Sequence, residues 1–230
     1  MQSCCSRTSR CSITRRRNRR SSFNKRFALI VIAILDYGSG NLRSAQRAFE
    51  RSGREVVVTS DRDTALNAEG LVVPGVGAFA ACMRGLVAVG GDAIVRERVE
   101  KKRPTLGICV GMQILFRDGD EHNEGALHQG VGIWQESITK LDAPILPHMG
   151  WNTVEVSANS TLFKGIEDQS FYFVHSYAAK KAVGQVQTWS SHNEKFLAAV
   201  EDGAIAATQF HPEKSGDAGL ALIKNWVGTL

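Results

Sequence analysis

Apolar and polar positions follow two different periods in the first half of the chain. Residues 29–35 (LIVIAIL) form a continuous apolar run rich in β-branched side chains, which predicts a strand buried on both faces. Residues 41–53 (NLRSAQRAFERSG) space their apolar side chains at helical intervals and end at a glycine, which predicts an amphipathic helix. The same change of period recurs, with strands predicted over 54–60, 71–75 and 105–110 and helices over 78–86 and 91–102. Strands that alternate with helices predict a parallel sheet with helices on both faces and an active site at the carboxyl ends of the strands.

The pattern changes after residue 131. Short apolar segments separated by turn residues predict strands over 131–141, 152–157, 171–177, 195–201 and 204–210. We expect these strands to be antiparallel and to extend or flank the sheet. Residues 216–230 predict a closing helix, and no repeat or apolar stretch of transmembrane length interrupts the pattern.

Length and composition suit a single α/β domain. A chain of 230 residues, 43% of them hydrophobic, can bury a substantial core. The five cysteines are odd in number and include no C-x-x-C pair in the body of the chain, so they indicate neither a disulfide framework nor a zinc site. A reducing, cytoplasmic location fits them best. We expect one domain over residues 29–230, preceded by an extension over residues 1–28, and neither a metal nor an organic cofactor.

The net charge of +5 is unevenly distributed. Residues 1–35 hold nine Lys or Arg and no acidic residue, which leaves 19 basic and 23 acidic residues, a net charge of −4, for the rest of the chain. The high isoelectric point therefore belongs to the extension. The predicted domain itself gives no reason to expect a nucleic-acid or membrane partner.

The extension has several interpretations. Its Ser- and Arg-rich, acid-free composition suits an organellar transit peptide, and residues 27–35 have the length of a signal-peptide core, although no small-residue cleavage site follows. Residues 19–23 (RRSSF) loosely resemble a twin-arginine signal, and a basic arm would also bind nucleic acid non-specifically. We favour a disordered segment or a start assigned too far upstream, with the native chain beginning near Ile30 or Val31.

Cys109 lies where a predicted strand gives way to a helix. The segment from Gly107 to Gly111 (GICVG) has the spacing of the nucleophile elbow, G-x-S-x-G, with sulfur in place of oxygen. The two glycines allow a sharp reversal where side chains would clash, and the unpaired N–H groups at the helix start favour a thiolate. Taken alone, the pattern suits a nucleophile and a buried core cysteine equally well.

A cysteine nucleophile needs a general base, and three of the six histidines have a carboxylate two residues later. His122 and His192 stand in polar, turn-like segments, so we expect them at the surface. His211 follows an apolar strand, and Pro212 favours an extended backbone before it, so His211 and Glu213 would share one face. We predict that His211 is the general base and acid and that Glu213 orients its imidazole.

Six motifs carry a family resemblance: ILDYGSGNLRSA (34–45), PGVGAF (74–79), GICVGMQ (107–113), PHMGWN (147–152), YFVHSY (172–177) and QFHPEKSG (209–216). In this order they resemble the class I, or triad, glutamine amidotransferases. More narrowly, they resemble the glutaminase subunits of imidazole glycerol phosphate synthase in histidine biosynthesis. The resemblance covers residues 31–230. Branches that serve anthranilate, GMP or carbamoyl phosphate synthesis usually have Pro-Gly-Gly where this chain has Val76.

The resemblance implies a flavodoxin-like fold and hydrolysis of L-glutamine through a thioester on Cys109, with His211 and Glu213 completing the triad. Ammonia would pass to a cyclase subunit, a (β/α)8 barrel, which forms a heterodimer with this chain and makes imidazole glycerol phosphate and aminoimidazole carboxamide ribotide. Little glutaminase activity is expected without that partner and its ribotide ligand. The alternative is a triad glutaminase serving another ammonia-dependent synthase. A catalytically silent module is disfavoured because all three triad residues are present.

The resemblance also implies roles for residues outside the triad. The oxyanion of the tetrahedral intermediate would be held by backbone N–H groups at Val76, Gly77 and Val110. The substrate glutamine would be bound by Gly77, Gln113, His175, Ser176 and Tyr177. The cyclase subunit would be contacted by Asn41, Trp151, Tyr172 and Lys214.

Overall fold

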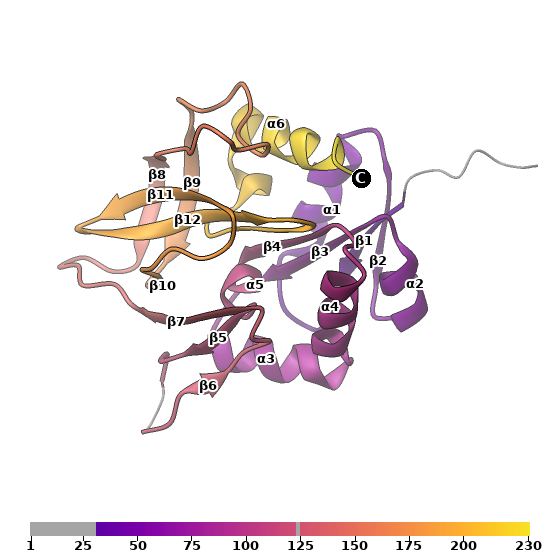
Figure 1. Ribbon diagram of the computed structural model, residues 1–230, viewed down its shortest axis with the longest axis horizontal. Coiled ribbons are helices and arrows are strands. Elements are labelled where there is room, and N and C mark those ends of the chain that lie inside the picture. The colour runs from indigo at the N-terminus through magenta and orange to yellow at the C-terminus, as the bar shows by residue number, and fades with distance from the viewer. Residues whose placement is uncertain (1–30, 123–124) are drawn as a thin grey trace, which may run out of the picture.

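The computed structural model describes residues 31–122 and 125–230, which form an α/β fold around a seven-stranded sheet of order β11-β12-β13-β4-β3-β1-β2 (Figure 1). The parallel strands are β1 (Val31–Leu35), β2 (Glu55–Thr59), β3 (Gly70–Gly75), β4 (Thr105–Cys109) and β13 (Ile205–Thr208). Their order is the flavodoxin-like one, so the predicted fold class is confirmed. The expectations for residues 1–28 lie outside the described residues, as do the first two residues of the predicted first strand.

Helices cover both faces of this sheet, as the alternating pattern predicts. The helices are α1 (Leu42–Glu50), α2 (Arg62–Asn67), α3 (Phe79–Ala88), α4 (Gly91–Glu100), α5 (Val110–Gln113) and α6 (Gly216–Val227). Figure 1 shows α1 and α6 on one face and α3 and α4 on the other. The apolar stripe of α1 buries Phe49, whose ring meets Trp226 of α6 edge to face at 5.7 Å between centroids.

The sequence pattern did not predict several short elements. Helix α2 has six residues, too few for an amphipathic period, and begins where the Asp61 carboxylate accepts a hydrogen bond from Thr64 N at 2.8 Å. The helix expected after Cys109 is only one turn long, and the chain then enters β5 (Phe116–Gly119). Strand β11 (Val186–His192) is polar at most positions, which hides its pairing with β12 (Glu194–Asp202).

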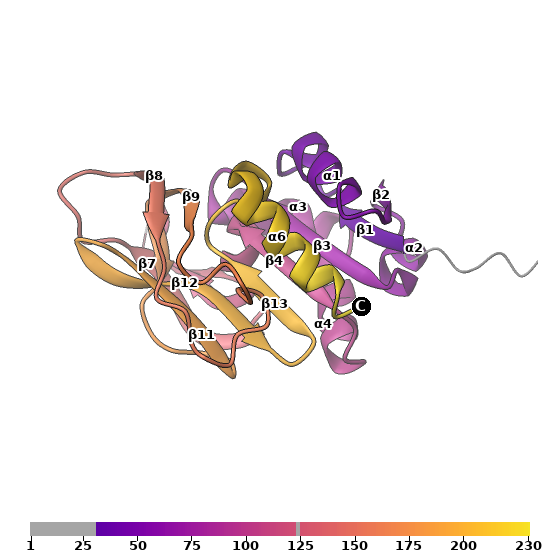
Figure 2. The ribbon, with the colours of Figure 1, turned by 90° about the horizontal axis from the view of Figure 1, so that it is seen from above.

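Most strands of the C-terminal half form the predicted antiparallel pairs, but β13, expected to be antiparallel, also pairs with β4 in parallel. A second sheet has the order β10-β7-β5-β6, with β6 (His128–Gln129), β7 (Trp134–Lys140) and β10 (Tyr177–Ala179). A third pairs β8 (His148–Thr153) with β9 (Ser170–His175), so the strand expected over 152–157 begins and ends earlier than predicted. Figures 1 and 2 both place β8 and β9 at the opposite end of the molecule from α2.

The two other H-x-E histidines differ in their surroundings. His122 lies in a turn with its side chain 80% exposed, as predicted. The turn-like segment expected around His192 is wrong, and the side chain is less exposed than expected. His192 ends β11 and is half-buried, because its ring stacks on His148 at 4.4 Å between centroids.

Arg98 of α4 links the end of α2 to the loop before β4. Its side chain is completely buried, and the guanidinium donates hydrogen bonds to backbone carbonyls at the end of α2 and before β4: Ala65, Leu66, Ala68, Glu69 and Pro104. Burial, followed by the charge of Arg103, lowers the pKa of Arg98 to about 10. Pro104 O also accepts from Leu71 N, but the carbonyls of Ala65, Leu66 and Ala68 would lose their donor. Arg98 therefore holds the end of α2 against the loop that leads into the strand bearing Cys109.

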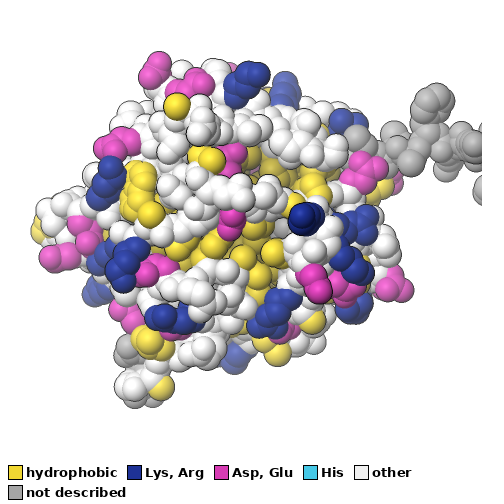
Figure 3. Space-filling model, in the orientation of Figure 1, with side chains coloured by type: hydrophobic (Ala, Val, Ile, Leu, Met, Phe, Trp, Pro, Cys, Tyr) yellow, Lys and Arg dark blue, Asp and Glu magenta, His cyan; other side chains and the backbone are white. Residues whose placement is uncertain are grey.

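The surface of the described residues carries charges of both signs. On the face shown in Figure 3, Lys and Arg side chains are interspersed with Asp and Glu. None of the helices in residues 31–122 and 125–230 has the length and apolar character that a membrane span requires.

Candidate active site

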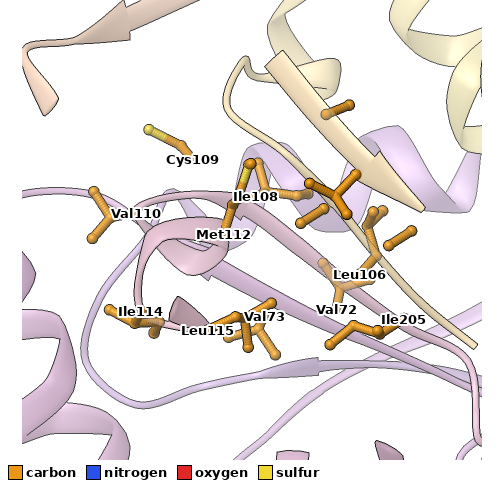
Figure 4. Close-up of a cluster of buried hydrophobic side chains, with 14 of the residues drawn as sticks. Val72, Val73, Leu106, Ile108, Cys109, Val110, Met112, Ile114, Leu115 and Ile205 are labelled. Atoms are coloured by element: carbon orange, nitrogen blue, oxygen red, sulfur yellow. The ribbon is translucent and has the colours of Figure 1, made fainter. Parts of the chain in front are cut away.

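Cys109 occupies a strained turn between β4 and α5. Its backbone has φ 56° and ψ −116°, a region that non-glycine residues rarely adopt. A Cβ on Gly111 would lie 1.9 Å from the carbonyl oxygen of Val73, and one on Gly107 would lie 2.8 Å from Gly111 O. The predicted reason for both glycines is therefore confirmed, because the turn packs backbone directly against backbone. Figure 4 shows the Cys109 side chain pointing away from the apolar cluster around Leu106.

His211 and Glu213 form a buried hydrogen-bonded pair. His211 Nδ1 lies 2.7 Å from Glu213 Oε1, and the two side chains are 2% and 5% exposed. His211 is extended, with φ −100° and ψ 98°, as Pro212 predicts. Glu213 lies in a 3-10 turn over Pro212–Lys214, so this turn, and not the alternation of a strand, brings the two side chains together.

The electrostatics of this pair favour a charged imidazole. Burial by itself lowers the pKa of His211, but the interactions with Cys109 and Glu213 outweigh burial and raise it to about 9. A protonated His211 beside Cys109 is the partner that a thiolate requires. The three side chains can therefore perform nucleophilic and general acid–base chemistry.

A cavity of about 580 Å³ opens over the sulfur. It brings together most of the predicted site residues: Val76, Gly77, Cys109, Val110, Gln113, His175, Ser176, Tyr177, His211 and Lys214. Glu213 lies behind His211 and borders a much smaller cavity together with Asn41. The cavity is thus formed by residues from four parts of the chain: the end of β4, the loop over residues 75–78, the connection between β9 and β10, and the segment after β13.

The loop predicted to hold the oxyanion is engaged elsewhere in this structure. Val76 N donates a hydrogen bond to Ser39 Oγ at 3.2 Å, and the same hydroxyl donates to Val76 O at 2.8 Å. Gly77 has φ 93°, a conformation that glycine adopts readily. Because glycine is also free to adopt other backbone conformations, the loop can change its direction at this residue. Use of the Val76 N–H as an oxyanion donor therefore requires the loop to leave Ser39.

The residues predicted to face a partner have different surroundings. Trp151 is 59% exposed and pairs in register with Tyr172, whose ring it meets at 6.1 Å between centroids. Asn41 caps α1 by accepting a hydrogen bond from Ser44 N at 3.3 Å. Lys214 is exposed and lines the cavity. Three of these four residues, Asn41, Trp151 and Tyr172, therefore also have a local structural contact.

Two polar residues of the site, Glu121 and Gln209, were not predicted from the sequence. Glu121 lines the cavity, and its Oε2 accepts a hydrogen bond from Phe79 N at 2.7 Å. Gln209 is completely buried, with Nε2 3.9 Å from Cys109 Sγ. Glu121 follows β5, which was not predicted, so no sequence pattern identifies it as a site residue. Gln209 stands two residues before His211, and this position could have identified it as a neighbour of the active site.

A pair of buried histidines supports the cavity wall. His175 Nε2 lies 3.0 Å from His148 Nδ1, and His175 Nδ1 lies 3.0 Å from Tyr177 O. Burial, together with the neighbouring histidine charges, lowers the pKa of His148 to about 4 and that of His175 to about 3. Both rings are therefore neutral at physiological pH.

Comparisons with known proteins agree on a family. The family model described as Glutamine amidotransferase class-I matches residues 33–228. A relative from Mycobacterium bovis named imidazole glycerol phosphate synthase subunit HisH is 59% identical over 203 residues, which are 86% of this chain and 98% of the relative. A protein of the same name from Corynebacterium glutamicum is 55% identical over 207 residues, 86% and 97% of the two chains.

Solved structures of low identity share the fold. A crystal structure of a glutamine amidotransferase has a TM-score of 0.67 at 19% identity and covers 85% of this chain and 98% of its own. The structure of PurLQS from Thermotoga maritima has a TM-score of 0.64 at 19% identity, with coverages of 87% and 99%. At this identity they support the architecture alone.

Proposed function

This chain belongs to the class I glutamine amidotransferases, and we propose that it is the glutaminase subunit of an imidazole glycerol phosphate synthase. The observation that carries the chemistry is the meeting of Cys109 and His211 in one cavity, with Glu213 bonded to the imidazole behind. The narrower assignment rests on identities of 55–59% that extend over nearly the whole length of the HisH relatives.

In the first half-reaction, the Cys109 thiolate attacks the side-chain carbonyl carbon of glutamine. The C–N bond of the tetrahedral intermediate then breaks, and ammonia leaves with a proton supplied by His211. In the second half-reaction, His211 takes a proton from water, which attacks the thioester and releases glutamate and the thiolate. Glu213 stabilises the imidazolium and holds the ring in one orientation throughout.

The intermediate carries an oxyanion that needs donors. The Val110 N–H follows the nucleophile directly, and the Val76–Gly77 loop supplies a second N–H once it leaves Ser39. Loss of one such donor typically costs about two to three orders of magnitude in rate. We therefore expect low glutaminase activity while the loop stays in its present position, before the partner binds.

The α-ammonium and α-carboxylate of glutamine need complementary groups. Glu121 provides a carboxylate on the cavity wall, and Gln113, Ser176 and Tyr177 provide polar atoms nearby. The Gln113 Nε2 already donates to Tyr177 O at 2.8 Å, which leaves its oxygen available to the substrate. We assign glutamine binding to this wall.

Ammonia is protonated in bulk water, so its release requires a direct route to an acceptor. The exposed apolar side chains Met149 and Trp151 stand on β8, whose first residue follows the cavity-lining Pro147. We propose that a cyclase barrel docks here, with Trp151 as an anchor and Lys214 at the passage. We also propose a cytoplasmic location and an N-terminal extension that activity does not require.

The function is tested by mixing the purified protein with glutamine, the cyclase subunit and its ribotide ligand, and measuring glutamate release. We expect release to rise when both are added, to be lost in Cys109→Ala, and to survive deletion of residues 1–28. Unchanged release on addition of the cyclase, or activity that persists in Cys109→Ala, would refute the proposal. Copurification with a different ammonia-dependent synthase would reassign the partner.

A further inference from the structure

We propose that Gln209 is a positioning residue for the nucleophile, with its side-chain N–H donating to the sulfur of Cys109. The inference deepens the proposed glutaminase activity and rests on it for the kinetic part of its test. Gln209 Nε2 lies 3.9 Å from Cys109 Sγ, within the range for hydrogen bonds to sulfur, and Gln209 is 0% exposed. Its own backbone is fixed by a hydrogen bond from Gln209 N to Ala198 O at 2.8 Å.

The orientation of the Gln209 amide follows from a backbone carbonyl. Tyr177 O can only accept, so the amide atom of Gln113 that lies 2.8 Å from it must be the nitrogen. The same nitrogen lies 3.1 Å from the Gln209 amide, which must therefore present its oxygen. The Gln209 nitrogen is then the atom that faces Cys109.

The same carbonyl orients the histidine pair. His175 Nδ1 faces Tyr177 O and so carries its proton, which makes His175 Nε2 an acceptor for the N–H of His148. His148 Nε2 in turn accepts from Asn152 Nδ2 at 3.2 Å, and that amide also donates to Ser191 O at 2.9 Å. The carbonyl oxygens of Tyr177 and Ser191 therefore determine which nitrogen of each histidine carries the proton. The hydrogen bonds of this network then have a single arrangement.

Besides His211, the sulfur has two polar neighbours with opposite preferences. Val174 O lies 3.9 Å from Cys109 Sγ and can only accept, so it suits the thiol form, whose S–H donates. The Gln209 N–H suits the thiolate, which can only accept. A carboxamide does not gain or lose a charge near neutral pH, so Gln209 holds the charged sulfur without competing with His211 as an acid or base. Val174 O and the Gln209 N–H thus hold the sulfur in the thiol and the thiolate form, respectively. The sulfur can then transfer its proton to His211 without moving.

Two substitutions separate the donor from the rest of the network. Gln209→Leu removes both polar atoms, whereas Gln209→Glu keeps an oxygen for Gln113 and replaces the donor with a second acceptor beside the sulfur. Gln185→Leu makes the same change as the first variant at an exposed position and serves as its control. Thermal melting of each variant verifies folding, and Gln209→Met provides a flexible apolar replacement if Gln209→Leu is unstable.

Two readouts are measured on the folded variants. The first is the rate at which iodoacetamide alkylates Cys109 at pH 7, followed by mass spectrometry of its peptide, which needs neither glutamine nor the partner. The second is kcat and KM for glutamine in the complex with the cyclase subunit. We expect alkylation and kcat to fall at least about tenfold in Gln209→Leu and further in Gln209→Glu, with KM within about twofold, because hydrogen bonds to charged groups are strong.

Some outcomes would overturn the inference. Wild-type alkylation in folded Gln209→Leu or Gln209→Met would show that the amide does not act on the sulfur. A raised KM with unchanged kcat would assign Gln209 to substrate binding through Gln113. If the wild-type complex releases no glutamate while Gln209→Leu still slows alkylation, the proposed function fails and the contact with Cys109 stands.

Discussion

Glu213 accepts a hydrogen bond from His211 through Oε1 at 2.7 Å, while its Oε2 is buried with no hydrogen-bond partner among the described residues. The carboxylate is therefore held mainly by the imidazole. We expect Glu213→Gln to keep the shape of the site but lose the charge that stabilises the imidazolium. The expected fall in kcat of the complex is about 10²- to 10⁴-fold, measured by glutamate release.

Glu194→Gln is the matched control for this substitution. Glu194 also stands two residues after a histidine, but its carboxylate pairs with Lys180 at 2.7 Å. We expect kcat to stay within about twofold of the wild type. Equal losses in the two variants would contradict the assignment of Glu213 as the orienting residue.

The titration of His211 reports its pairing with Cys109. The pKa of about 9 is raised above that of the unfolded chain, so its contribution to stability is present below pH 6.5 and is lost as the pH rises through 9. We expect Cys109→Ala to remove one of the two causes and lower the His211 midpoint, measured by NMR. It should also weaken the loss of stability at alkaline pH. An unchanged midpoint would show that the sulfur does not interact with the ring.

His148 and His175 give the opposite dependence at acidic pH. Their pKa values, about 4 and about 3, are lowered in the folded state, so their contribution is present above pH 6.5 and is lost as the pH falls. Partly offset by His211, the free energy of unfolding should drop by about 1–2 kcal/mol between pH 7.0 and 5.5. Urea titrations at the two pH values measure this change, and equal values would contradict neutral, buried rings.

Arg98 should matter to stability and not to chemistry. Arg98→Met leaves several buried carbonyls without donors, so we expect the free energy of unfolding to fall by about 3 kcal/mol or more in urea titrations. Arg96→Met is the control, because Arg96 on the same helix is exposed and makes one ion pair with Asp92 and one hydrogen bond to Val131 O, so its loss should cost about 1 kcal/mol. Similar losses in the two variants would refute a special role for Arg98.

Trp151 tests the proposed docking surface. We expect Trp151→Ala to weaken the complex with the cyclase subunit by about thirtyfold in Kd, since large exposed aromatic anchors dominate such interfaces. Isothermal titration calorimetry measures the affinity, and alkylation of Cys109 in the free subunit should be unchanged. A wild-type Kd would place the interface elsewhere.

The sequence predicted features that have a local signature. The elbow at Cys109 was recognisable because Gly107 and Gly111 lie close to it in the chain, and the extended backbone at His211 because Pro212 follows it. Gln209 contacts Cys109 across 100 positions of sequence, and Ser39 contacts Val76 across 37. Such contacts arise from the order of strands in the sheet, and no periodicity along one segment encodes them.

The length of the helix after Cys109 shows the same limit. The apolar run that follows Val110 suits a helix as well as a strand, and tertiary packing decides between them. Gly111 fits directly against β3, so the helix is confined to one turn before Phe116 enters the second sheet. The wrong expectation for His192 has a similar origin, because the partner that buries it, His148, lies on another strand.

The positive φ of Cys109 lowers the stability of the protein at the residue that its activity requires. Glycine adopts φ 56° readily, so Cys109→Gly should relieve strain at the elbow and melt at a higher temperature while losing all glutaminase activity. A laboratory selection for thermal stability alone would therefore favour loss of the nucleophile. Any stabilised form of this protein must be selected with glutamine turnover as a second criterion.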